Sequence, residues 1–157
     1  MMCIIRILGA KKMTTVEQVP IDVAGANERL GLGIEFYKQV LRMFLGEASN
    51  RIRAMRDALE REDAYAFERS AHSLKGSAGN LGVEGIRALA AQGEALGREQ
   101  RLQEALPSAE ATETEDDRNQ WNGSFAQEAL PIVEATETEL RRVAQYMTVC
   151  FESDLVT

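Results

Sequence analysis

Four stretches of the chain place apolar residues at alternating steps of three and four, which is the period of an amphipathic α-helix. The first runs from Ile34 to Leu59. The second begins after Asp63, a residue type that favours helix N-caps, and ends before Gly82, a residue type that favours helix ends. The third covers about Val83 to Ala105 and the fourth about Phe125 to Cys150.

Each stretch presents one apolar stripe, and these stripes predict the core. The first stripe consists of Ile34, Tyr37, Leu41, Phe44, Ala48, Ile52, Met55 and Leu59. The others consist of Phe67, Ala71, Leu74, Ala78 and Leu81; of Val83, Ile86, Leu89 and Leu96; and of Ala129, Ile132, Thr136, Leu140, Val143 and Met147. With a short extra helix near Asp22–Leu30, the pattern predicts an all-α protein, an antiparallel up-down four-helix bundle with a short extra N-terminal helix.

Pro131 conflicts with a regular fourth helix, because a proline in a helix interior removes a backbone hydrogen bond. Either the regular helix starts near Leu130, where proline is tolerated in the first turn, or the helix kinks at the proline. The preceding segment, Asp116 to Ser124, is polar and contains Asn-Gly, which is typical of a loop.

Composition narrows the function classes. The chain has 157 residues, and its 25 acidic and 18 basic residues give a net charge of −7. That balance disfavours nucleic-acid binding. No apolar run is long enough to span a membrane. One histidine and two distant cysteines (Cys3 and Cys150) supply neither a zinc site nor a disulfide framework, so a cytoplasmic location is expected.

Most of the acidity lies in one duplicated stretch. The sequence Q-E-A-L-P-S-A-E-A-T-E-T-E begins at Gln103, and a near-copy with Ile132 and Val133 begins at Gln127. The apolar pair indicates that the second copy faces the core and that the first copy is solvated. We therefore expect a flexible leader over 1–20 (with Met13 as a possible true start), a bundle over 21–151 with an acidic insertion at about 106–123, and a tail over 152–157.

The single histidine, His72, lies in the second predicted helix but off its apolar stripe. At about 100° per residue, Leu74 is roughly 200° away from it, so the imidazole projects toward water. Five residues share its face, namely Glu68, Arg69, Lys75, Gly76 and Gly79. An exposed nucleophile beside a cation and beside glycines that clear space favours transient phosphorylation by a docking protein.

The segment H-S-L-K-G-S-A-G-N-L-G, from His72 to Gly82, resembles the signature of histidine-containing phosphotransfer (HPt) domains, H-x-L-K-G followed after five residues by Gly. The resemblance covers about Asp22–Ala105 and resumes over about Phe125–Cys150. It implies that His72 is the phosphoacceptor nucleophile, that Lys75 stabilises the phosphoryl group, and that Gly76 gives the partner clearance.

Other residues on the same face have roles that the residues alone leave open. Gly79 would join the partner-docking face. Glu68, one turn before His72, would orient the imidazole by accepting from its other ring N–H, or would be a solvated docking residue. Arg69 would contact either the partner or the phosphoryl group.

The implied function is a two-component phosphorelay intermediate. His72 would accept a phosphoryl group from an aspartyl-phosphate receiver domain or a (hybrid) sensor histidine kinase, and pass it to another receiver. The chain lacks an ATP-binding motif such as G-x-x-x-x-G-K-[ST], so it would not be a kinase by itself. It would need no cofactor and no metal of its own, because Mg²⁺ is expected in the receiver partner. Neither nucleic acid nor membrane is an expected partner.

Two other functions remain open. The chain could be a phosphoacceptor module of the type found in chemotaxis kinases, which carry a similar motif. It could also be a non-phosphorylated helical adaptor that uses its acidic repeat as a docking surface. A pure scaffold has no need of an exposed histidine with glycines on the same face, which favours the relay. A metal site at His72 lacks nearby ligands.

Overall fold

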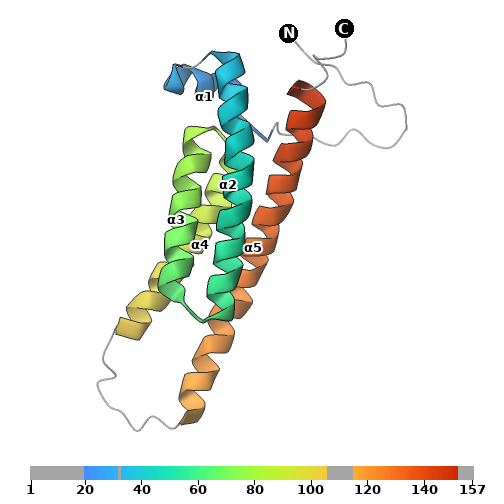
Figure 1. The fold of residues 1–157 in the computed structure, drawn as a ribbon. Coiled ribbons are helices and arrows are strands. Elements are labelled where there is room, and N and C mark those ends of the chain that lie inside the picture. The colour runs from blue at the N-terminus through green and yellow to red at the C-terminus, as the bar shows by residue number, and fades with distance from the viewer. Residues whose placement is uncertain (1–19, 32, 106–114, 152–157) are drawn as a thin grey trace, which may run out of the picture.

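A computed structural model describes residues 20–31, 33–105 and 115–151, and for 115–124 it describes the backbone alone. This part of the chain is all-α (Figure 1), with helices α1 (Val23–Leu30), α2 (Ile34–Glu60), α3 (Ala64–Asn80), α4 (Glu84–Ala105) and α5 (Glu115–Phe151). Helices α2 to α5 form the predicted antiparallel bundle. The leader before residue 20, residues 106–114 of the acidic stretch and the tail after residue 151 lie outside the described residues.

The core confirms two of the predicted stripes. On α2 the whole stripe is buried except Ile34, which is 43 % exposed at the first turn of the helix. On α3 every predicted position is buried. Two side-chain caps start their helices as expected: Asp22 accepts from the backbone N–H of Gly25 at 3.0 Å, and Asp63 from that of Ala66 at 2.8 Å.

The predicted stripe on α4 is only half right. Ile86 is buried, but Leu89 and Leu96 are half-buried. The buried face instead continues through small and polar residues, namely Ala90, Gly93, Glu94, Gly97 and Gln100. A Cβ atom added at Gly97 would lie 3.0 Å from the backbone nitrogen of Glu68, so α3 and α4 are in close contact there. The glycines permit a close approach that leucines would prevent.

Helix α5 corrects the prediction for its start. The loop expected over Asp116–Ser124 is wrong, because the backbone there is helical, and the helix continues through Pro131. A start near Leu130 is therefore wrong as well. The predicted core-facing role of the second repeat copy is confirmed by Val133, which is fully buried. Phe125, directly after this segment, is buried and meets Phe67 edge to face, with ring centroids 5.4 Å apart.

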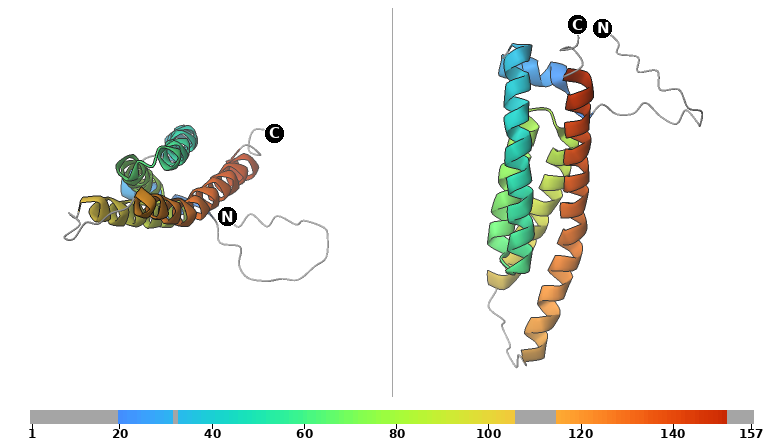
Figure 2. Two further views of the ribbon diagram at one scale, coloured as in Figure 1. Left: turned by 90° about the horizontal axis from the view of Figure 1, so that it is seen from below. Right: turned by 45° about the vertical axis from the view of Figure 1, so that its right-hand side comes forward.

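Helix α1 lies across the end of the bundle (Figure 2), over the turn that joins α3 to α4. The backbone N–H of Asp22 donates to the Gly82 carbonyl at 2.9 Å. From α2, the buried Tyr37 hydroxyl donates to the Leu81 carbonyl at 2.6 Å. Gly82 takes the left-handed conformation (φ +71°) that the sequence led us to expect at this helix end. None of the helices over the described ranges is both long and apolar enough to cross a membrane.

Candidate functional site

His72 lies on the outer surface of α3, as its helical phase predicted. Its side chain is 66 % exposed. The adjacent Ala71 and the nearby Leu74 are fully buried and fix the rotation of the helix. The burial of the α3 stripe therefore holds the imidazole at the surface.

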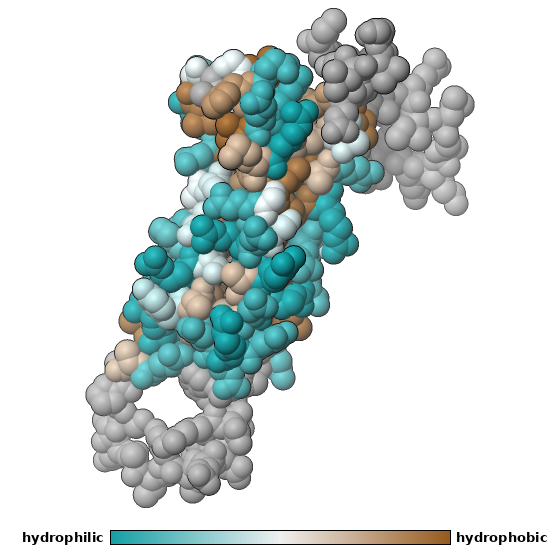
Figure 3. Space-filling view, in the orientation of Figure 1, coloured by the Kyte–Doolittle hydropathy of each residue, from teal (hydrophilic) through white to brown (hydrophobic). Residues whose placement is uncertain are grey.

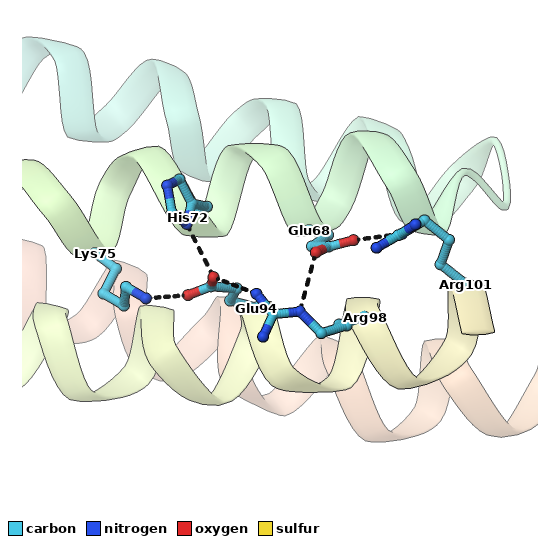
Figure 4. Close-up of polar contacts among 6 residues, drawn as sticks. All are labelled: Glu68, His72, Lys75, Glu94, Arg98 and Arg101. Atoms are coloured by element: carbon cyan, nitrogen blue, oxygen red, sulfur yellow. Dashed lines mark hydrogen bonds and ion pairs between the residues drawn. The ribbon is translucent and has the colours of Figure 1, made fainter. Parts of the chain in front are cut away.

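The imidazole is anchored on one side by a carboxylate from α4. The Nδ1 atom of His72 lies 2.9 Å from Oε1 of Glu94 (Figure 4). Because an ionised carboxylate only accepts hydrogen bonds, this contact places the hydrogen of a neutral imidazole on Nδ1. The lone pair is then on Nε2, at the side of the ring turned away from Glu94.

Glu94 is buried, with a side-chain exposure of 7 %, and its charge is well compensated. Lys75 of α3 pairs with Oε2, and Nη2 of Arg98 lies 2.9 Å from Oε1. The hydrogen bond from Lys75, the largest cause, and the bond to His72 hold the pKa of Glu94 below its usual range against the opposing effect of burial. A carboxylate that stays ionised is a constant acceptor for the Nδ1 hydrogen.

The expectation that Glu68 orients His72 is wrong, because Glu94 occupies that place. Glu68 instead binds two arginines of α4: Nε of Arg101 is 2.7 Å from Oε2, and Nε of Arg98 is 3.3 Å from Oε1. The hydrogen bond from Arg101 is the largest cause that lowers the pKa of Glu68. Arg98 therefore bridges both carboxylates, and the network continues from Lys75 to Arg101 along the line between α3 and α4.

Sequence reasoning missed Glu94, which lies 22 positions after His72 on the next helix. Its one available signal was its position between Gly93 and Gly97. Small residues indicate close helix packing, and a charged side chain buried there needs an ion pair or a hydrogen bond. Three cations, Lys75, Arg98 and Arg101, surround the two carboxylates of Glu68 and Glu94. Figure 3 shows that hydrophilic side chains cover most of the visible middle of the bundle.

The remaining predicted residues lie around this network. Gly76 is exposed, and a Cβ added there would meet nothing within 4 Å, so the surface beside His72 is open. Gly79 is half-buried, and an added Cβ would lie 3.1 Å from Cδ of Arg87. Arg69 is turned toward Tyr65, with its guanidinium carbon 5.9 Å from the ring centroid. The structure thus joins His72, Lys75 and Glu68 in one network and leaves Arg69 outside it.

Comparison with known proteins adds one finding. A protein-family model described as the Hpt domain matches residues 39–146. The matched range includes the His72 motif and Glu94, and extends from α2 into α5. No curated protein and no solved structure matches the chain.

Proposed function

Because this chain belongs to the Hpt domain family, we propose that it is a phosphorelay intermediate in which His72 carries the phosphoryl group. It would accept the group from the aspartyl phosphate of a receiver domain, or from a histidine kinase, and pass it to a second receiver. The observation that carries the proposal is the contact between His72 Nδ1 and the buried Glu94, which leaves Nε2 as the free nucleophile on an exposed face.

The chemical step uses few groups. The lone pair on Nε2 attacks phosphorus in line; the new N–P bond forms as the P–O bond to the donor aspartate breaks, and the aspartate leaves as a carboxylate. The imidazole keeps its Nδ1 hydrogen and becomes a cation. Glu94 faces that developing charge at hydrogen-bond distance and stabilises it, in the same way that a carboxylate supports a catalytic histidine elsewhere.

Lys75 would supply charge to the phosphoryl group. Its side chain is one-third exposed and pairs with Glu94 in the unphosphorylated protein. A phosphoryl group on Nε2 would offer a second anion within reach of the same side chain.

The partner would complete the site. Gly76 leaves the surface beside His72 open, so a receiver can bring its phosphorylated aspartate close to the imidazole. Mg²⁺ and its acidic ligands would belong to the receiver, and this chain would contribute no cofactor, metal or kinase activity. We expect this exchange to take place in the cytoplasm.

The test is transfer from a phosphorylated receiver, together with labelling by phosphoramidate, a small donor that needs no docking surface. The wild type is expected to acquire label that is labile in acid and stable in alkali. His72→Gln is expected to acquire about a hundredfold less label, because a glutamine amide is not a nucleophile at neutral pH. Circular dichroism would verify that the variant folds. Label that persists on His72→Gln would refute the assignment, and binding of receivers without any labelling would favour the adaptor function.

A further inference from the structure

A second exposed cluster adjoins His72 at the end of α3 nearest to the α2–α3 turn. It consists of Tyr65, Arg69, Arg98, Arg101 and Leu102, which we call the Tyr65 patch. Tyr65 is 55 % exposed and Leu102 is 54 % exposed, so both offer apolar surface to a partner. The arginine side chains Arg98 and Arg101 are 53 % and 42 % exposed.

Helical spacing places this patch on the same side of the molecule as His72. Tyr65, Arg69 and His72 follow each other at steps of four and three, so they share one face of α3. Glu68 binds Arg98 and Arg101, and thereby ties the adjoining face of α4 to α3 (Figure 4). The surface that a partner meets at His72 therefore continues over one more turn of both helices.

The patch is cationic although the chain as a whole is not. Glu68, only 12 % exposed, lies beneath Arg98 and Arg101 and compensates part of their charge, and Glu94 also pairs with Arg98. Arg69 has no ion pair with any residue that the structure describes, and lies over the Tyr65 ring instead. An excess of positive charge thus remains on this face of a chain whose net charge is −7.

We propose that the Tyr65 patch is a docking surface for an acidic segment of the receiver partner, which presents carboxylates to the arginines and an apolar side chain to Tyr65 and Leu102. This inference rests on the proposed function and names the chemistry of its partner. Tyrosine and arginine are enriched at protein interfaces, and a cation held over an aromatic ring gives both a flat contact and a charge. Complementary charge speeds association and selects among partners more than it adds affinity.

The experiment measures the second-order rate of transfer from a phosphorylated receiver at low and at high salt. Arg69→Glu is expected to lower this rate about tenfold at low salt and much less at high salt, because screening removes the charge effect. Tyr65→Ala is expected to lower it at both salt concentrations. The matched control is Arg53→Glu, the same charge reversal in the groove between α2 and α5, which is expected to leave the rate unchanged.

Labelling by phosphoramidate separates this inference from the proposed function. It is expected to stay within about twofold of the wild type in Arg69→Glu and Tyr65→Ala, because no partner docks. Equal transfer rates for Arg69→Glu and Arg53→Glu would overturn the patch. So would a rate loss confined to Met43→Glu, because Met43 is a 75 % exposed residue of α2 and such a loss would place the partner there. Failure of the wild type to label with phosphoramidate would instead refute the role of His72.

Discussion

At the scale of single residues, the buried carboxylate of Glu94 determines which ring nitrogen of His72, the candidate nucleophile, carries the hydrogen. The HPt signature identified His72 and Lys75 from the sequence, because the signature lies within one helix. It did not identify Glu94, because the contact depends on how α3 and α4 pack. The error over Glu68 has the same origin: Glu68 is one turn from His72, yet two arginines of α4 bind it.

The ionised Glu94 makes stability depend on pH. Hydrogen bonds from Lys75 and, to a smaller extent, from His72 lower the pKa of Glu94 in the folded protein. The ionised Glu94 therefore adds to the free energy of unfolding above its unfolded-state pKa of about 4.3. This contribution is lost as the pH falls through the lower folded-state pKa. We expect the wild type to be more stable than Glu94→Gln by about 1–2 kcal/mol near pH 7, and this advantage to shrink as the pH falls below the unfolded-state pKa of Glu94. Urea unfolding at a series of pH values measures it. A difference that is constant from pH 7 to pH 3 would contradict the assignment.

At the scale of helices, the packing of α3 against α4 depends on glycine. A Cβ at Gly97 would come within 3.0 Å of the backbone nitrogen of Glu68 and 3.1 Å of its Cα. Gly97→Ala should therefore push the helices apart and destabilise the fold by about 1–3 kcal/mol, despite the better helix propensity of alanine. Gly46→Ala on α2 is the matched control, since nothing lies within 4 Å of its added Cβ; it should stabilise by about 1 kcal/mol. Thermal unfolding of the two variants gives both signs, and equal shifts would argue against close packing at Gly97.

The helices also show why sequence patterns succeed on some elements and fail on others. The stripes of α2 and α3 are rich in large apolar residues, so their period predicts burial. On α4 the close approach to the backbone of α3 is at Gly97, a residue that a search for apolar positions passes over. On α5 the Asn-Gly pair and Pro131 are strong local signals against a helix, yet the helix runs through both.

At the scale of the whole molecule, the polar contacts around His72 and those between α2 and α5 lie on different sides of the bundle. His72 and its network lie between α3 and α4, whereas α2 and α5 meet through an ion pair in which Nη2 of Arg56 is 2.9 Å from Oε1 of Glu137. The antiparallel four-helix arrangement followed from periodicity, because four one-sided helices leave few other ways to bury their apolar faces.

Because the Arg56–Glu137 pair lies away from His72, breaking it is expected to affect the free energy of unfolding slightly and the labelling of His72 not at all. Both side chains are at least one-third exposed, so solvent screening limits their coupling to less than about 1 kcal/mol. A double-mutant cycle with Arg56→Gln and Glu137→Gln, followed by chemical denaturation, measures that coupling. Labelling of His72 by phosphoramidate should be the same in all four proteins. A change in the labelling rate would mean that the two sides of the bundle are coupled.

The turn between α3 and α4 constrains how the protein can be re-engineered. The turn accepts hydrogen bonds from the backbone of Asp22 and from the Tyr37 hydroxyl. A Cβ added at Gly82 would lie 2.6 Å from the carbonyl oxygen of Asp22. New chain termini or an inserted reporter domain at this turn would cut through a buried junction of α1, α2 and α3. The turn at Arg61 and Glu62 is exposed, and is the better place to open the chain for circular permutation.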